Sequence, residues 1–210
     1  MGVLMSDIEQ GTDEWFAIRC GKVTASRVAD VIATTKTGYS ASRANYEAQL
    51  ICEILTGKPA ESYSNAAMAW GTETEPLARA QYELKTGEMV NQVGFVVHPM
   101  IEQAGASPDG LVGSEGLIEI KCPNTSTHLD TLLAQKVPSK YITQMTWQMV
   151  CTGRKWCDFV SYDPRLPENL QLFVQRIELD EDYAKKLQNE VVMFLAEVNE
   201  KVEKLRKINV

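Results

Sequence analysis

Apolar residues recur along the chain with two different spacings, and each spacing predicts one kind of element. Helical spacing predicts helices at residues 13–19, 24–32, 45–55, 141–150 and about 180–207, with a further helix from about 72 to 85 and a short one within 124–137. Alternating or continuous apolar runs predict strands at residues 89–98, 117–122, 156–162 and 170–177. Helices therefore precede and follow a group of strands.

This order of elements predicts an α/β or α+β fold, in which helices flank a central mixed β-sheet. The length of 210 residues suits one domain spanning 1–210, with the long C-terminal helix appended. That helix has an acidic first turn and basic last turns, as the helix dipole favours. Its apolar face, which we expect to pack inward, consists of Leu187, Val191, Phe194, Leu195 and Val198.

The densest candidate chemistry lies in a predicted hairpin. Residues 107–111 read Ser-Pro-Asp-Gly-Leu, which is turn chemistry, and the second strand ends before Pro123. Because side chains alternate along a strand, Glu119 and Lys121 share one face while Ile118 and Ile120 share the other. Asp109, at the start of the partner strand, can reach the same place.

Two carboxylates at one point repel each other unless a cation lies between them. Mg²⁺ prefers one or two carboxylates together with water and phosphate oxygens, so Asp109 and Glu119 are candidate ligands, with the carbonyl of Ile120 beside them. Lys121 would then orient or activate an attacking water. A surface hairpin with an ordinary Glu–Lys pair is the alternative that these residues leave open.

A longer pattern resembles a known family. Pro108-Asp109 followed by Glu119-Ile120-Lys121 resembles the PD-(D/E)XK nuclease signature, and the string around it is similar to the YqaJ-type viral recombinase family of lambda-type exonucleases. The resemblance extends over most of the chain, through residues 10–15, 19–21, 24–26, 69–71 and 162–165.

The resemblance implies a restriction-endonuclease-like core and a Mg²⁺-dependent exonuclease, in which Mn²⁺ can replace Mg²⁺. Such an enzyme degrades one strand of double-stranded DNA from its 5′ end and leaves a 3′ overhang for strand annealing. The metal ligands would be Glu75, Asp109, Glu119 and the Ile120 carbonyl, with Lys121 helping the nucleophile. A homotrimer around DNA and a single-strand annealing recombinase as partner are also implied. A capping box with Thr72 is the alternative role for Glu75.

The resemblance also implies a pocket for the terminal 5′-phosphate, formed by Arg19 and Ser26 with Ser107 and Gln144. The residues add a physical reason, because Thr24 fits the N-cap of the predicted helix at 24–32, and free N–H groups there would attract an anion. Arg19 could add a bidentate contact. An ordinary capped helix with a surface arginine is the alternative.

The composition restricts the partners. The net charge of −7 requires that Lys and Arg gather on one surface if the protein binds DNA. The polar segment 34–43 predicts a loop in which Lys36, Tyr39 and Arg43 either touch DNA or are simply solvated.

Five cysteines without a Cys-x-x-Cys pair argue against disulfides, structural zinc and an iron–sulfur cluster. We expect these cysteines to be buried and inert, and we do not expect Cys122 and His128 to form a nucleophile and its base. No apolar run is long enough to cross a membrane, and residues 1–7 do not resemble a signal peptide, so we expect a cytoplasmic protein.

Two other functions stay open at this point. One is a structure- or sequence-specific DNA endonuclease of the same fold. The other is a DNA-end-binding module without catalysis, which the presence of Asp109, Glu119 and Lys121 disfavours.

Overall fold

A five-stranded mixed sheet forms the centre of the computed structural model, which describes residues 7–60 and 66–208. Its strand order is β10-β9-β8-β7-β4, and only the β8–β9 pair is parallel. The strands are β4 (Val90–Asn91), β7 (Gly110–Val112), β8 (Gly116–Lys121), β9 (Trp156–Tyr162) and β10 (Leu172–Glu178). The parallel pair places Lys121 beside Ser161, so both strands end at the same edge of the molecule.

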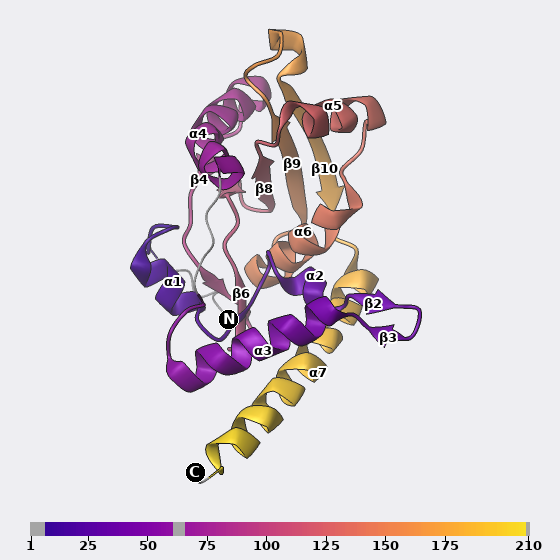
Figure 1. The fold of residues 1–210 in the computed structure, drawn as a ribbon. Helices are drawn as coiled ribbons and strands as arrows, with labels where there is room; N and C mark the ends of the chain where they lie inside the picture. The colour runs from indigo at the N-terminus through magenta and orange to yellow at the C-terminus, as the bar shows by residue number, and fades with distance from the viewer. Residues whose placement is uncertain (1–6, 61–65, 209–210) are drawn as a thin grey trace.

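Helices cover both faces of this sheet (Figure 1). Ile118 and Ile120 pack with residues of α4 (Ala66–Thr86), whereas Leu117 packs with Met145 and Met149 of α6 (Ser139–Thr152). Helix α5 (Thr125–Ala134) lies on the same face as α6. The predicted alternation along β8 and the predicted core role of the two methionines are therefore confirmed.

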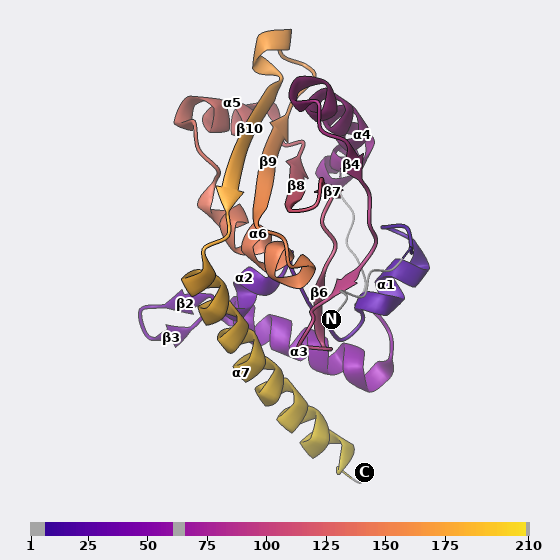
Figure 2. The same cartoon turned by 180° about the vertical axis from the view of Figure 1, so that it is seen from behind.

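A second core lies beyond α6. It joins a three-stranded sheet to three helices, and Trp147 and Cys151 of α6 contribute to it. The strands are β1 (Val23–Thr24), β5 (Val96–Val97) and β6 (Ala104–Ala106), and the helices are α2 (Val28–Val31), α3 (Ala41–Thr56) and α7 (Glu181–Arg206). Helices α3 and α7 pack together at the end of the molecule remote from α5, as Figures 1 and 2 both show.

The remaining elements are α1 (Asp13–Arg19), the hairpin β2 (Thr34–Thr35) with β3 (Gly38–Tyr39), and a short 3₁₀ turn η1 (Glu168–Leu170). The predicted fold class, a mixed sheet flanked by helices, is confirmed. So are α1, the β7–β8 hairpin, β9, and a C-terminal helix whose apolar face is buried. Strand β10 is an edge strand, as its half-exposed pattern indicates.

Two predicted elements are wrong. Residues 89–98 form two short strands in different sheets, because Val90 pairs with Val112 and Val96 pairs with Ala106. Residues 24–27 are not helical, since Thr24 pairs with Gly105 in β1 and its N–H donates to the Tyr46 hydroxyl over 3.2 Å. The helix starts only at Val28 and has no side-chain cap. In both cases a partner far away in sequence sets the backbone.

Two residue-level expectations also need correction. Arg43 is not in a loop that could reach DNA, because it lies in α3, 5% exposed, and its guanidinium binds Glu197 over 2.8 and 3.1 Å. The segment before it is a hairpin in which Tyr39 donates to Glu190 over 2.9 Å. Cys151 and Cys157 are buried as expected, but Cys52 is exposed.

Within the described residues, no helix combines the length and the apolar character needed to span a bilayer. Residues 1–6, on which most of the argument about a signal peptide rests, lie outside the described part of the chain.

Candidate active site

The end of β8 brings together the acidic and basic residues that the hairpin predicted. The carboxylate of Glu119 is completely buried, and its Oε1 lies 2.5 Å from Nζ of the half-buried Lys121. Asp109 precedes β7, and its Oδ2 accepts the backbone N–H of Ile120 over 2.6 Å. The three side chains therefore meet because β8 supplies two of them and the residue just before its antiparallel partner β7 is the third.

Two glutamines of α6 fix the Glu119 carboxylate. Gln144 Nε2 donates to Oε1 over 2.7 Å, and Gln148 Nε2 donates to Oε2 over 2.6 Å. The four-residue spacing of these glutamines puts both on the helix face that covers β8. Gln148 was given no role in the sequence analysis, so this contact was missed.

Around Asp109, the negative charges of the carboxylates outnumber the positive charge of Lys121. Burial raises the pKa of Asp109 well above its ordinary value, and the negative charges of Glu119 and Glu75 raise it further, while Lys121 opposes them. Burial alone would lower the pKa of Lys121, but Glu119 and Asp109 raise it, so the amine stays protonated. Asp109 thus carries an unfavourable charge that a cation would stabilise.

Glu75 approaches the same cluster from α4. It acts electrostatically on both Asp109 and Cys122, and its Oε1 lies 2.5 Å from Nη2 of Arg79. The capping-box alternative is wrong, because α4 is already helical from Ala66 and the Thr72 hydroxyl donates to the Met68 carbonyl over 3.2 Å. Glu75 is therefore not a capping residue, and its carboxylate lies near the cluster while it pairs with Arg79.

The residues present fit a hard divalent cation in their chemistry. Asp109, Glu119, Glu75 and the Ile120 carbonyl offer only oxygen atoms, the donors that Mg²⁺ and Mn²⁺ take in such sites. The side chains of the described residues do not already form a group of three or more metal-binding residues. Instead, Lys121 and the two glutamines occupy the Glu119 oxygens. The raised pKa of Asp109 is the observation that favours a cation here.

Two of the four predicted phosphate-binding residues lie around Trp15. The guanidinium of Arg19 stacks on the Trp15 ring, 3.6 Å from its centroid, and the indole N–H donates to the Ser107 hydroxyl over 2.9 Å. Burial lowers the pKa of Arg19 to about 10, although Tyr46 and Glu53 partly offset it. Its buried Nε has no hydrogen-bond partner among the described residues, so the guanidinium retains an unused donor.

The other two residues are placed differently. Ser26 is exposed in the turn before α2, with its hydroxyl 3.4 Å from that of Thr24. The helix N-terminus that was expected at Thr24 is absent, so backbone N–H groups of a long helix do not support this position. Gln144 binds Glu119 and therefore belongs to the acidic cluster.

Cys122 and His128 do not form a nucleophile and base, as expected. Burial raises the pKa of the Cys122 thiol to about 12, and nearby carboxylates raise it as well. His128 is buried between Ser161 and the Leu170 carbonyl, with ring nitrogens 2.7 and 2.8 Å from them. The thiolate needed for such chemistry is therefore unfavourable.

The sequence of this chain matches a known protein family. A profile of the YqaJ-like viral recombinase domain matches residues 14–155. The chain belongs to this family. The match contains α1 from Glu14 onward, the acidic cluster and α6, but not β10 or α7. No curated protein sequence matches the chain.

Solved structures agree with the family assignment. An alkaline exonuclease (LHK-Exo) from Laribacter hongkongensis is 57% identical with a TM-score of 0.87, covering 93% of this chain and 97% of that one. The same values hold for LHK-Exo in complex with dAMP. A phage related exonuclease from Haemophilus somnus 129PT, 16% identical, has a TM-score of 0.70 over 88% of this chain and 96% of that one, which shows a shared fold.

Proposed function

We propose that this protein is a divalent-metal-dependent exonuclease that degrades one strand of duplex DNA from the 5′ end and leaves a 3′ overhang. Membership of the YqaJ-like family and 57% identity to an alkaline exonuclease identify the protein as a nuclease. One observation carries the proposed metal dependence: Glu119 and Lys121 are in contact beside Asp109, whose carboxylate charge is unfavourable.

We assign the metal-binding role to Asp109 and Glu119, with Glu75 and the Ile120 carbonyl as further ligands. Mg²⁺ is the proposed ion, with Mn²⁺ as a substitute, and when bound it would polarise the phosphate and lower the pKa of water. Lys121 stays protonated in this setting, so it can orient the attacking water and stabilise negative charge that develops on the phosphate. Gln144 and Gln148 keep the Glu119 carboxylate in place.

The direction of cleavage is assigned to a pocket for the 5′-phosphate whose main residues are Arg19 and Ser107. Ser26, and Gln144 with its contact to Glu119, are its further proposed members. Support comes from the Trp15 side chain, which contacts both Arg19 and Ser107, and from the unused Nε donor of Arg19. A guanidinium binds phosphate oxygens more strongly than it binds water.

Digestion of a linear duplex tests the proposal directly. One preparation is labelled at the 5′ ends and a second at the 3′ ends, and each is incubated with Mg²⁺ and with a chelator. Early release of the 5′ label, only with Mg²⁺, is the expected result. Cleavage of covalently closed circular DNA would indicate an endonuclease instead, and binding without cleavage would indicate an end-binding module.

The phosphate pocket has a separate test. Arg19→Ala should reduce the preference for 5′-phosphorylated over 5′-hydroxyl ends by about tenfold, since one charge-assisted contact is lost. Arg27→Ala is the control, because Arg27 also stacks on an aromatic ring, that of Tyr46, and is tied to Asp30. Equal rates on both kinds of end in the parent protein would contradict the pocket.

We further propose, from family membership, that the protein acts as a homotrimeric exonuclease domain in the cytoplasm and transfers its overhang to a single-strand annealing recombinase. Sedimentation of the purified protein would test the trimer. Co-purification with an annealing protein encoded nearby would test the partner.

A further inference from the structure

Arg165 lies just after β9 and connects three segments of the chain. Its Nε and Nη2 donate to the two carboxylate oxygens of Asp163 over 2.7 and 2.9 Å, and Nη2 also donates to the Pro123 carbonyl over 3.2 Å. The guanidinium carbon lies 4.5 Å from the ring centroid of Trp70 in α4. One side chain therefore joins the ends of β8 and β9 to α4.

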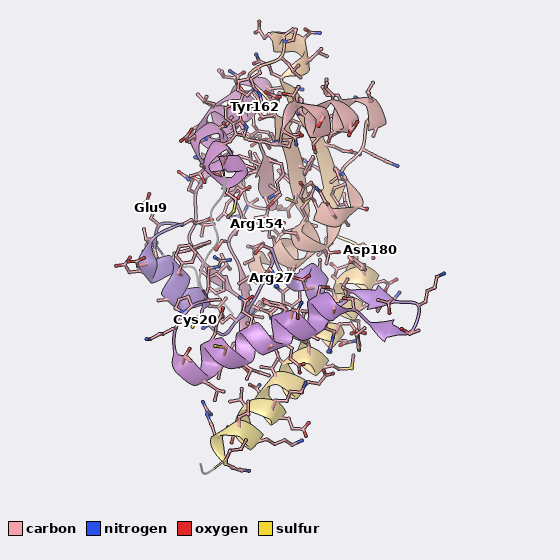
Figure 3. The ribbon with its side chains drawn as sticks, viewed as in Figure 1. Glu9, Cys20, Arg27, Arg154, Tyr162 and Asp180 are labelled. Carbon is pink, nitrogen blue, oxygen red and sulfur yellow. The ribbon has the colours of Figure 1, made fainter. Side chains whose placement is uncertain are left out.

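These contacts lie next to the acidic cluster. Pro123 follows Lys121 by two residues, and Cys122 between them experiences the negative charges of Glu75, Asp109 and Asp163 together. Figure 3 shows Tyr162, the last residue of β9, beside α4, and the core cluster that contains Tyr162 also contains residues of that helix. Arg165 is thus close to the cluster without belonging to it.

The first turns of α4 are mostly exposed, and Trp70 is their residue that contacts Arg165. None of residues 66–73 is buried, and only Trp70 and Gly71 are even half-buried. Pro76 lies inside the helix and has no N–H to donate to the carbonyl four residues earlier, which weakens the helix at this point. The packing of Trp70 against Arg165 is one contact that holds this segment, which leads directly to the buried Thr74 and to Glu75.

We propose that Arg165 is a positioning residue for the nuclease site: it holds α4, and with it Glu75, against the end of β8 that carries Glu119 and Lys121. The proposal rests on the function proposed above. Asp163 fixes the guanidinium plane through two parallel hydrogen bonds, and Thr125 donates to the same carboxylate over 2.7 Å. A lysine could keep the charge but not the planar stack on Trp70.

The chain contains a matched control at the other end of β9. Arg176 donates to the buried Asp158 over 2.8 and 2.9 Å, and its guanidinium carbon lies 3.3 Å from the centroid of Trp156, the first residue of the strand. The same three types of side chain are thus combined in the same way, but away from Glu75 and Lys121. Loss of Arg176 should cost stability and leave the nuclease site intact.

The experiment compares Arg165→Ala, Arg165→Lys and Arg176→Ala with the parent protein. We expect Arg165→Ala to lower kcat on linear duplex about 10- to 100-fold with KM for DNA unchanged, as for residues that orient a metal site. Calorimetric titration with Mn²⁺, without DNA, should show weaker binding by a similar factor. Arg165→Lys should recover only part of kcat, and Arg176→Ala should lose melting temperature but keep kcat.

A double variant separates positioning from general destabilisation. Trp70→Leu breaks the same contact from the other side, so the combination with Arg165→Ala should lose no more kcat than the worse single variant. Additive losses, a parent-like kcat in Arg165→Ala, or losses in both arginine variants that follow their melting temperatures would overturn the proposal. Absence of cleavage by the parent protein would instead refute the proposed nuclease function, and the positioning role with it.

Discussion

Two aspartates, one on either side of β8, differ in the partners of their carboxylates. Asp158, in β9, is buried and fully paired, because Arg176 binds it with two hydrogen bonds and Tyr82 donates to it over 2.7 Å. Asp109 accepts one backbone N–H, and burial together with two nearby carboxylates raises its pKa, because the nearby Lys121 is paired with Glu119 and offsets them only in part. A carboxylate with its own cation contributes to stability, whereas one without such a partner marks the place where the protein needs a charge for another purpose.

The largest effect on the contrast between the two aspartates is expected from a substitution of Asp109. Asp109→Asn should reduce cleavage about 10³-fold, because one of the charges proposed to hold the cation is lost. The melting temperature at neutral pH should stay the same or rise, since a carboxylate with a raised pKa destabilises the folded state once it is ionised. Calorimetric melting and a timed digestion measure both effects. A variant with full activity would remove Asp109 from the site.

Lys121 should give the next largest effect. Lys121→Ala is expected to lower cleavage at least about 10²-fold while DNA binding persists, because the amine acts on the developing charge rather than on duplex affinity. Fluorescence anisotropy with a labelled duplex measures binding separately. Lys155→Ala is the matched control, since Lys155 also pairs with a glutamate, Glu115, but at the surface. Unchanged cleavage in Lys121→Ala would refute the role.

Asp158 should show the opposite behaviour. Asp158→Asn is expected to lower the free energy of unfolding by about 2–3 kcal/mol, because the buried end of the Arg176 pair loses its charge. Cleavage well below the melting temperature should match the parent protein. Urea unfolding and a digestion of linear duplex test these two expectations, and a specific loss of kcat would show that the two aspartates are not separate in function.

A smaller effect, dependent on pH, is expected at Asp163. Burial alone would raise the pKa of this carboxyl, but hydrogen bonds from Arg165 and Thr125 lower it to about 2. Stability from this group is therefore present above its ordinary pKa and disappears as the pH falls through about 2. Asp163→Asn should cost about 2 kcal/mol at neutral pH, and the difference from the parent should shrink between about pH 4 and 2. Asp130→Asn, at an exposed position, is the control, and a gap that does not change with pH would contradict the assignment.

Local patterns predicted much of this molecule. Strand β9, the β7–β8 hairpin and the apolar face of α7 follow from periodicity and turn chemistry, which act within a few residues. The strand pairing of residues 89–98 does not follow from local pattern, because Val96 pairs with the distant Ala106. Phe95 also packs against Gly105, where an added Cβ would lie 2.3 Å from the Phe95 ring. The short α2 likewise reflects the pairing of Thr24 with Gly105.

In the candidate site, too, local sequence predicted some residues, while others depend on contacts with distant elements. Asp109, Glu119 and Lys121 could be predicted because one hairpin carries all three. Gln148 and Arg165 could not be assigned, since each acts through a residue on another element: Gln148 through Glu119, and Arg165 through Trp70. Arg43 was misplaced because its partner Glu197 lies in α7, far along the chain.

The cysteines differ in exposure, which allows one of them to be labelled selectively. Cys52 is exposed on α3, whereas Cys20 and Cys122 are partly covered with raised pKa values and Cys151 and Cys157 are buried. A maleimide dye or a surface linker should therefore attach to Cys52 before the other thiols. Immobilised or fluorescent enzyme could be prepared in this way without engineering, with its attachment point on the exposed side of α3, a helix that packs in the core without the acidic cluster.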